Sequence, residues 1–599
     1  MSKEELVNLW MANDLLQSER MEPEVVGENV FGELLLHSFF EDIKKNKDGK
    51  TKTLKIHDLM HDLASAVMKS EYSLFEVGMS RNIINSSIQD DEISPRHVSI
   101  ILLPSSSELS TINVSSIGRF LSSHQRHLRT FFLFSNEDRG MFASHVISVI
   151  SDLKNLRVLR VESWNAEIST LPLSFGDKLK HLRYLNLRDC GLSSLHGQSF
   201  RGMKNLQFLD LSRNGIDMEI IPDSVGKLEQ LRHLNLSENK GLKVLPESLG
   251  NLTKLETLKL NGCSELITLP QSTSKLCSLK RLENEDCWRL RGMPSGIGQG
   301  LSRLEKLSLW VWEWGSEESE NIEGLRGLSL LGGSLLIRIR GLSKEDVAAL
   351  RDGEEEEVLT NKTNLSTLKI QFSFFCDDDV SSINEQALQI LKPPSNIESL
   401  SIQWYKGRRF PEWMEMRDPH SSSSSFPRLR TIQLNTILKL EEWVLNWRHK
   451  EECLPALQHL RIKYCNGLKG LPKELGNLAT LNSLYVYDCK ELVSVPQLIY
   501  LESLTIDYCS ELVSMPQLEL MTSLKDLTIS DCPKLKFVFH GLRHLTSLQH
   551  LRINRSPGVV IPKEELDPLV ALRGPSFLED IDEELIHDQY HHQEESTTT

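Results

Sequence analysis

The sequence predicts an α/β solenoid whose parallel sheet lines a concave face, preceded by a small and mostly helical domain. The main observation is a recurring pattern with apolar first, fourth and sixth positions and an asparagine or cysteine at the ninth, as in Leu255, Leu258, Leu260 and Cys263. Copies of the pattern begin at Leu182, Leu206, Leu231, Leu255, Leu457, Leu481, Leu501 and Leu524. The length of 599 residues exceeds one ordinary compact domain, whereas a solenoid grows by adding repeats. Residues 1–75 lack the pattern and show the apolar spacing of helices instead.

The copies have the period of leucine-rich repeats, because the first four are spaced by 24, 25 and 24 residues. Leu-x-Leu alternation turns both leucines to one face of a strand and the intervening residues to the other. Stacked strands bury the leucines in a shared core, and the asparagine or cysteine lies where the chain turns away from the sheet. A proline soon after, as in Leu269–Pro270, ends the turn because proline cannot extend a hydrogen-bonded ladder. The residues between the leucines therefore form an outward-facing surface, where we expect function.

Composition excludes several classes of function. A net charge of −15 argues against nucleic acid or an acidic membrane surface as the main partner, although Arg408–Arg409 is a local basic patch. The sequence shows neither a signal-peptide pattern nor about 18 consecutive apolar residues, so we expect a cytoplasmic protein without a membrane span. Seven of the ten cysteines occupy the repeat position, which predicts buried, reduced thiols rather than zinc ligands.

Residues 1–75 have the element order of a winged-helix domain. Helical spacing over Leu6–Trp10 predicts a first helix, and a second is expected over residues 24–42. A charged turn leads to a short strand at 53–56, and helical spacing resumes over 59–67. Helix, helix, hairpin-like wing and helix together predict the domain.

The stretch Ile56–Ala64, I-H-D-L-M-H-D-L-A, holds two His-Asp pairs four residues apart. Such pairs are able to ligate a metal, but the motif is not H-E-x-x-H and no third group of ligands lies nearby. We therefore predict no metal site. The acidic cluster Asp377–Asp379 lacks the alternating ligands and the glycine of a calcium loop, and we predict no metal there either.

Several motifs in one order resemble plant nucleotide-binding leucine-rich-repeat disease-resistance proteins of the coiled-coil type. They are Leu6–Ala12, Gly27 with Phe31, Glu33–Leu34 with Ser38–Phe40, and Ile56–Ala64. They match the end of the family's nucleotide-binding region, a winged-helix subdomain with a Met-His-Asp motif, whose methionine is replaced here by Ile56. In the family the motif histidine contacts the phosphate of bound ADP and helps to hold the inactive state. The resemblance implies this role for His57, with Asp58 as the matching aspartate.

One departure from the family pattern limits that implication. The sequence contains no G-x-x-x-x-G-K-[ST], so the loop that cradles phosphates is absent from it. We expect no cofactor for the chain alone, and ADP or ATP only where a nucleotide-binding core is supplied. The alternative for His57 is a structural histidine that caps the junction between wing and helix.

The remaining chain divides by the regularity of its repeats. We expect a linker with the first irregular repeats over 76–150, including a loop over 103–116, and regular repeats over 151–310. Irregular repeats with acidic and serine-rich insertions follow over 311–456; the part from Leu325 to Ile339 resembles a non-standard repeat segment of one branch of the same family. Regular repeats return over 457–573, and a disordered tail is predicted for 574–599.

The concave face of the C-terminal repeats is the predicted protein-binding surface, because it mixes aromatic, basic and acidic residues. Its residues are His459, Arg461, Lys463, Tyr485, Tyr487, Thr505, Asp507, Thr528, His550 and Arg552. A second aromatic group comprises Trp310, Trp312, Trp404 and Trp413. These tryptophans either contact a partner or cover the solenoid where the repeats are irregular, and we favour the structural role.

No catalytic constellation is evident, so we do not expect an enzyme. The resemblance implies part of an intracellular immune receptor whose repeats bind a pathogen effector or a guarded host protein and hold the nucleotide-binding core in its inactive state. The alternative is a truncated scaffold or decoy that binds proteins without signalling, which the missing phosphate loop favours. A substrate adaptor of a ubiquitin ligase would need an F-box-like segment, which residues 1–75 do not resemble.

Overall fold

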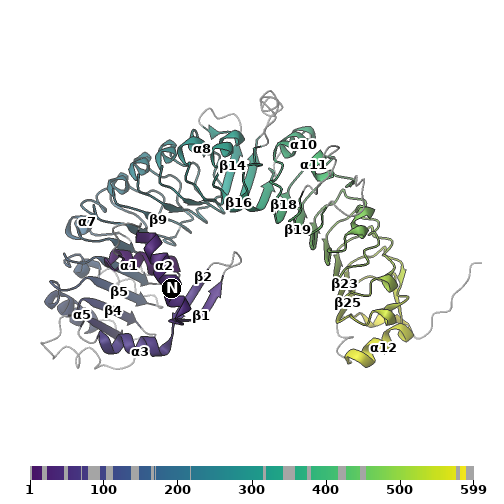
Figure 1. Ribbon diagram of the computed structural model, residues 1–599, viewed down its shortest axis with the longest axis horizontal. Coiled ribbons are helices and arrows are strands. Elements are labelled where there is room, and N and C mark those ends of the chain that lie inside the picture. Colours follow the sequence, from purple (N-terminus) through teal and green to yellow (C-terminus); the bar gives the residue numbers. More distant parts are fainter. Residues whose placement is uncertain are drawn as a thin grey trace, which may run out of the picture. The chain divides into compact units, whose positions relative to one another are not determined.

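The chain forms two compact units, residues 1–305 and 306–599, which are described separately. The computed structural model is shown in Figure 1. It describes residues 3–16, 23–45, 51–68, 71–77, 95–102, 112–135, 147–163, 168, 170–215, 218–313, 319–341, 358–373, 380–415, 426–445, 454–574 and 581–587. The acidic run at 354–357, the acidic cluster at 377–379 and the serine run at 421–425 lie outside these ranges.

The first unit begins with the winged-helix arrangement that the sequence predicts. Its elements are α1 (Lys3–Ala12), α2 (Pro23–Leu36), the antiparallel strands β1 (Phe40–Lys45) and β2 (Thr51–Ile56), and α3 (Asp58–Val67). The second helix ends at Leu36, before the expected end near residue 42, because the chain from Phe40 joins the hairpin. The buried core of the domain comprises Leu6, Phe31, Phe40 and Leu54. Gly27 lets α1 and α2 approach closely, since a Cβ there would lie 2.5 Å from Cγ1 of Val7.

A parallel sheet forms the body of the first unit. Its strands are β3 (Tyr72–Val77), β4 (His97–Leu102), β5 (Thr130–Ser135), β6 (Val158–Ser163), β7 (Tyr184–Asn186), β8 (Phe208–Asp210), β9 (His233–Asn235), β10 (Thr257–Lys259) and β11 (Arg281–Glu283), each paired with the next. The central leucine of each strand from β7 to β11 stands in register with its neighbours and is almost fully buried, as the repeat pattern predicts. The outer side carries α5 (Ile112–Ser123), α7 (Phe175–Lys178), α8 (Ile297–Gly300) and three 3₁₀ turns, Asp223–Lys227, Glu247–Asn251 and Gln271–Lys275.

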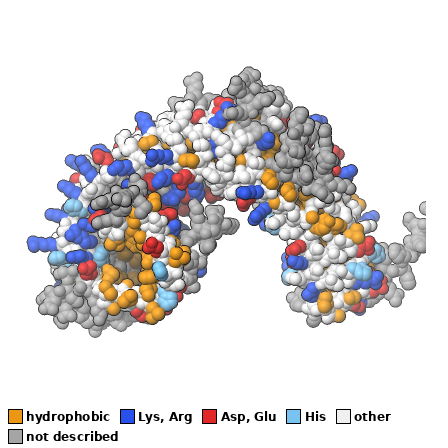
Figure 2. Space-filling model, viewed as in Figure 1, with side chains coloured by type: hydrophobic (Ala, Val, Ile, Leu, Met, Phe, Trp, Pro, Cys, Tyr) orange, Lys and Arg blue, Asp and Glu red, His pale blue; other side chains and the backbone are white. Residues whose placement is uncertain are grey.

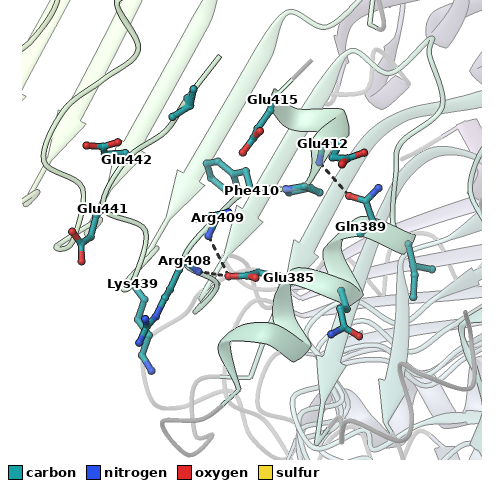
Figure 3. Close-up of a pocket in the computed structure, with 14 residues that line it drawn as sticks. Glu385, Gln389, Arg408, Arg409, Phe410, Glu412, Glu415, Lys439, Glu441 and Glu442 are labelled. Carbon is teal, nitrogen blue, oxygen red and sulfur yellow. Dashed lines mark hydrogen bonds between the residues drawn. The ribbon is translucent and has the colours of Figure 1, made fainter. Parts of the chain in front are cut away.

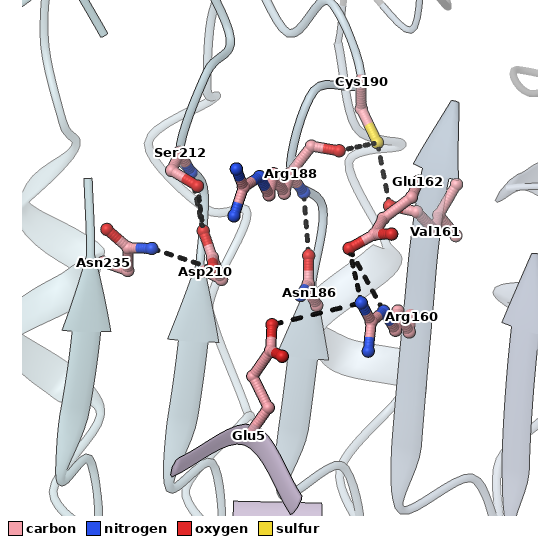
Figure 4. A network of polar contacts seen from close by, with 10 residues as sticks. All are labelled: Glu5, Arg160, Val161, Glu162, Asn186, Arg188, Cys190, Asp210, Ser212 and Asn235. Atoms are coloured by element: carbon pink, nitrogen blue, oxygen red, sulfur yellow. Dashed lines mark hydrogen bonds and ion pairs between the residues drawn. The ribbon is translucent and has the colours of Figure 1, made fainter. Parts of the chain in front are cut away.

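The asparagine or cysteine after each strand bonds neighbouring coils together. Asn214 donates from Nδ2 to the carbonyl oxygens of Leu187 and Leu211, at 3.0 and 2.8 Å, and its Oδ1 accepts from the backbone N–H of Cys190 at 3.0 Å. The Cys190 thiol lies 3.2 Å from the carbonyl oxygen of Val161, to which it donates (Figure 4). The seven cysteines at this repeat position are buried, as the sequence predicts.

The second unit repeats this architecture with longer strands. They are β14 (Leu309–Glu313), β16 (Gly332–Arg340), β17 (Asn364–Gln371), β18 (Ser399–Gln403), β19 (Thr431–Asn435), β20 (His459–Lys463), β21 (Ser483–Tyr487), β22 (Ser503–Asp507), β23 (Asp526–Ser530) and β25 (His550–Asn554). Helices α10 (Ser381–Ile390) and α11 (Glu412–Glu415) lie on the outer side (Figure 1). A small sheet of β24 (Phe537–Val538), β26 (Val559–Pro562) and β27 (Ile586–His587), with α12 (Lys563–Arg573), completes the unit.

Three stretches differ from the sequence-based expectations. Tyr72–Val77 forms the first strand of the sheet, so the array begins before residue 76. Ile112–Ser123 forms α5 within a stretch expected to be partly loop, because its last turn buries apolar side chains. Ile581–His587 is ordered within the tail predicted to be disordered, since Ile581 and Leu585 are buried and β27 pairs with β26.

Candidate protein-interaction surfaces

The winged-helix domain lies on the concave face of the first unit. Leu9 and Ala12 of α1 share a buried cluster with Val158, Tyr184 and Phe208, which lie on β6, β7 and β8. The rings of Tyr184 and Phe208 stack with centroids 4.3 Å apart and form a flat floor for the helix. One face of α1 thus packs inside the winged-helix domain, and the adjacent face of the same helix packs on the solenoid. We call this contact the α1 interface.

Acidic residues of α1 face basic residues of the strands. Glu4 binds Lys259 and Arg281, with each carboxylate oxygen 2.7 Å from one of the two cationic groups. Burial would by itself raise the pKa of Glu4, but the two cations outweigh it and lower that pKa to about 2. Glu24 of α2 adds a contact to Arg232 at 2.9 Å. The concave face therefore recognises the winged-helix domain through charge as well as apolar packing.

The residues just after α1 extend the interface. Asp14 forms ion pairs with Arg157, at 2.7 Å, and with Arg183. The side chain of Asn13 accepts a hydrogen bond from the Thr130 hydroxyl at 3.2 Å. These contacts fix the end of the helix at the start of strands β5 to β7.

Figure 4 shows a further part of this network, where Glu5 of α1 points toward Arg160 of β6. Their charged atoms are 4.0 Å apart, and Arg160 also pairs with Glu162 at 2.8 Å. Asp210, fully buried nearby, accepts hydrogen bonds from the backbone and hydroxyl of Ser212, while burial raises the pKa of its carboxyl group. The interface therefore rests on side chains that the sheet itself holds in place.

A buried histidine lies beneath α1. Burial lowers the pKa of His233 to about 4, although the nearby carboxylates of Glu4 and Glu256 raise it and the cations Arg281 and Lys259 lower it further. Its Nδ1 lies 3.9 Å from Glu4, too far for a hydrogen bond. The imidazole is therefore neutral at neutral pH, and its protonation opposes the docked arrangement.

The ten residues predicted for protein binding lie on β20 to β25, at the positions that alternate with the buried leucines, isoleucines and Val486. Lys463 Nζ lies 4.9 Å from the ring centroid of Tyr485, and His550 Nδ1 lies 2.7 Å from Asp526. Arg461 and Arg552 are exposed. Their place on the concave face agrees with the alternation, and their binding role stays a prediction.

Sequence reasoning missed three residues of this surface. Tyr464, Tyr508 and Arg555 follow the strands at the turn, where the backbone is left-handed. Tyr464 and Tyr508 each lie 5.4 Å from the ring of Tyr487, and the Arg555 guanidinium lies 5.9 Å over the ring of Tyr508. For the two tyrosines, the signal in the sequence is an aromatic residue directly before the repeat cysteine.

The tryptophan group is mainly structural. Trp310 and Trp312 are fully buried, and Trp413 donates from Nε1 to the carbonyl oxygen of Leu388 at 3.1 Å. Trp404 alone occupies a left-handed turn position and is partly exposed. The structural interpretation thus fits three of the four.

His57 caps α3, because its Nδ1 accepts a hydrogen bond from the backbone N–H of Leu59 at 3.2 Å. This is the structural role that the sequence left open beside the ADP contact, which stays a prediction. Asp58 pairs with Lys55 at 3.2 Å. Leu59 and Val67 of α3 are 68% and 76% exposed. Hydrophobic side chains gather on this part of the first unit in Figure 2.

A groove of about 920 Å³ lies on the outer side of the second unit, between α10 and the loops that follow β18 and β19 (Figure 3). Glu385 accepts hydrogen bonds from the backbone N–H groups of Arg408 and Arg409, at 2.7 and 3.3 Å, and Gln389 accepts one from Glu412 at 3.2 Å. These polar groups tie successive coils together along the groove.

Comparison with protein-family models matches three parts of the chain. Residues 1–64 match the winged helix domain of disease resistance proteins, residues 127–242 a leucine-rich repeat region, and residues 322–465 the R13L1/DRL21 leucine-rich repeats. The last match covers the segment in which the sequence resembles one branch of the family. The chain thus combines a disease-resistance winged-helix domain with leucine-rich repeats, and its homologues are plant nucleotide-binding leucine-rich-repeat disease-resistance proteins.

Individual relatives support this statement. RGA1 of Solanum bulbocastanum is 32% identical over 517 residues, which are 83% of this chain and 41% of the relative. RF45 of Arabidopsis thaliana is 27% identical over 92% of this chain and 52% of its own length, and both carry the name of a disease resistance protein. RGA2 of Solanum bulbocastanum is 50% identical over 74 residues, which are 12% of this chain and 7% of the relative. The chain therefore spans about half the length of the curated relatives that it matches.

Among solved structures, the leucine-rich-repeat protein LIC12759 of Leptospira interrogans is similar, with 19% identity and a TM-score of 0.42 over 80% of this chain and 93% of that one. Within the described parts of the chain, each helix is too short or too polar to span a membrane. The same parts contain no group of three or more histidine, cysteine or acidic side chains placed to bind a metal.

Proposed function

We propose that this chain is the regulatory and recognition part of an intracellular plant immune receptor. In this proposal the concave face of the second unit binds a pathogen effector or a guarded host protein. The α1 interface in the first unit holds the winged-helix domain in the inactive arrangement. The observation that carries the proposal is that α1 covers the concave face of the first unit, whereas Arg461, His550 and Arg552 on the second are exposed.

The α1 interface has the properties of a reversible clamp. Its ion pairs are partly exposed, so each contributes little by itself and the set is sensitive to salt. Its apolar part is small, with Leu9 and Ala12 as the buried helix residues. A contact of this size is stable within one chain and can be shifted by a partner that binds the open arrangement better.

The exposed apolar side of α3 supports a further part of the proposal. A helix with Leu59, Leu63 and Val67 more than half exposed is expected to pack against another protein surface. We propose that the nucleotide-binding core of an intact receptor packs there. His57 and Asp58, at the start of the same helix, would then face ADP as the family resemblance implies.

The test joins this chain to the nucleotide-binding region of its relative RGA1 and expresses the fusion in leaves. Asp14→Arg places a cation against Arg157 and Arg183, and we expect it to cause cell death without any pathogen protein. Adding Arg157→Asp and Arg183→Asp should suppress this cell death, because the ion pairs form again with the positive and negative charges exchanged. Glu28→Arg, an exposed change within the winged-helix domain, is the control.

Two results would contradict the proposal. One is an Asp14→Arg fusion that accumulates normally but causes no cell death. The other is cell death that the compensating aspartates leave unchanged, since that would show a general folding defect instead of a released clamp.

A further inference from the structure

Four tyrosines form a continuous aromatic surface on the second unit. Tyr485 and Tyr487 lie on the concave face of β21 with ring centroids 6.3 Å apart and nearly parallel planes. Tyr464 and Tyr508, from the coils on either side, each contact Tyr487 at 5.4 Å. We call these residues the tyrosine cluster.

Two members of the cluster lie at the left-handed turn that follows each strand. Tyr464 and Tyr508 have φ of 55° and 58°, at the turn position that directly precedes the repeat cysteine. The same turn position is left-handed in the first unit, where it holds Gly262 in one coil and residues such as Asp189 and Arg213 in others. The left-handed backbone therefore belongs to the repeat, and these two coils differ from the others in placing a tyrosine ring there. Both rings are also more than 40% exposed, so burial does not account for them.

The charge on the β20 side of the cluster is positive, whereas Asp507 lies beside Tyr487 on the β22 side. On β18, β19 and β20 the concave positions hold serine, threonine, glutamine, asparagine, histidine, arginine and lysine, and no acidic residue. Arg461 is exposed on β20, and Lys463 stands over the ring of Tyr485. Farther along, Asp526 is paired with His550 and Asp531 with Arg555, each at 2.7 Å. The basic edge of the cluster therefore stands out in a chain of net charge −15.

The first unit shows what such a face binds. Its concave arginines and lysine hold the carboxylates of α1, while aromatic rings of the strands pack against the apolar side of the helix. The second unit presents the same two elements, cations beside aromatic rings, and here Arg461, Tyr464 and Tyr508 are exposed.

We propose that the tyrosine cluster with Arg461 and Lys463 binds an acidic polypeptide segment of a partner protein. Carboxylates of the segment pair with the two cations, and its apolar side chains or proline rings lie on the tyrosines. Strands β20 to β22 span about 10 Å at about 4.8 Å per strand, which an extended segment covers with three or four residues. The proposal deepens the recognition role given above, since it states the chemistry of the recognised segment.

The experiment measures binding of fluorescein-labelled peptides of about a dozen residues to the purified full chain by fluorescence anisotropy. The probe alternates glutamate with proline, which keeps it extended and acidic. Peptides that alternate lysine or glutamine with proline are the matched controls, and a single-stranded RNA of similar length tests a nucleic-acid partner. We expect the glutamate peptide to bind, and more weakly at high salt.

Variants locate the binding. Arg461→Glu with Lys463→Glu should weaken the glutamate peptide about tenfold or more, and Tyr487→Ala should weaken it by a similar factor. The control is Lys469→Glu with Lys534→Glu, which makes the same change of charge at two exposed lysines that pair with Glu441 and Glu511. That control should leave binding unchanged. Circular dichroism of each variant shows that the solenoid is intact.

The proposal is overturned by absence of binding up to about 1 mM, by equal binding of the lysine or glutamine peptide, or by equal loss in the control variant. Tighter binding of the RNA would assign the surface to nucleic acid instead. None of these results depends on the α1 interface, so a failure here is distinct from a failure of the clamp in the leaf assay.

Discussion

Glu4→Gln is predicted to loosen the α1 interface. In the folded chain, burial would raise the pKa of Glu4, but Lys259 and Arg281 lower it from 4.5 to about 2. A shift of that size corresponds to about 3 kcal/mol in favour of the charged carboxylate. Because the side chain is 35% exposed, solvent screens part of this energy, and we expect a loss of about 1–2 kcal/mol on neutralisation.

A thiol placed inside the interface reports the loss. Ala12 is 1% exposed in the interface, so Ala12→Cys gives a thiol that reacts only when the winged-helix domain separates from the sheet. A loss of about 1–2 kcal/mol raises the separated population, and hence the labelling rate, by about 5- to 30-fold. Cys277 is exposed and serves as the internal standard, with both sites followed by mass spectrometry.

Glu28→Gln is the matched control. Glu28 also forms an ion pair, at 3.4 Å to Lys3, but this pair lies within the winged-helix domain and Glu28 is 64% exposed. We expect its labelling rate to stay within about twofold of the parent. Equal rates for Glu4→Gln and the parent, or equal acceleration by both substitutions, would refute the assignment of the interface to these charges.

Three further predictions concern pH and packing. The α1 interface should weaken as pH falls from about 6.5 toward 4. Burial lowers the pKa of His233 from 6.5 to about 4, so His233 takes up a proton in this range only when the winged-helix domain separates from the sheet. The labelling rate of Ala12→Cys relative to Cys277 measures the change, and His233→Gln should flatten its pH profile. Gly27→Val should lower the melting temperature of the winged-helix domain, at a cost of about 1–3 kcal/mol, because the new side chain would overlap α1. Gly32→Ala is the control: a Cβ there meets nothing within 4 Å, so the change should be neutral or stabilising by up to about 1 kcal/mol. Asn239→Ala should destabilise the first solenoid sheet by about 1–3 kcal/mol in thermal unfolding, because two buried carbonyl oxygens lose their donor, while Asn205→Ala at an exposed coil should cost less than half of that.

The repeats could be predicted from the sequence because one physical requirement governs every coil. A strand with Leu258 at its centre is stable only if Leu234 and Leu282 stack on it, so the spacing of leucines fixes both the strands and their register. The same alternation placed Arg461 and Tyr485 on the concave face. It could not place Tyr464 or Tyr508, because alternation ends where the strand ends and the left-handed turn redirects the side chain.

The α1 interface was beyond the reach of the sequence for a different reason. Helical spacing in the first helix shows that Leu6 and Leu9 are buried, but not against what. In the structure Leu6 packs inside the winged-helix domain, while Leu9 packs on β6 to β8 of the solenoid. The contacts of Asp14 join residues more than 140 positions apart, and no local pattern encodes such a pairing. The family resemblance led us to expect a clamp on a nucleotide-binding core, and the structure adds a contact within this chain itself.

The concave faces of the two units share one feature, which is that cationic side chains lie beside aromatic rings. In the first unit, arginines and lysine on the sheet are neutralised by the acidic residues of one helix, Glu4 and Asp14, which the chain itself supplies. Separation of that helix would leave four cations facing water on a surface already lined by Tyr184 and Phe208, and such a surface attracts another acidic ligand. On the second unit, the exposed Arg461 and the partly buried Lys463 already stand beside the partly exposed ring of Tyr485. It follows that Asp14→Arg, by opening the first face, should add a second, salt-sensitive binding site for the glutamate–proline peptide. The amount of peptide bound at saturation should then be about twice that of the parent. An unchanged stoichiometry would show that other groups still cover the cations of the opened face.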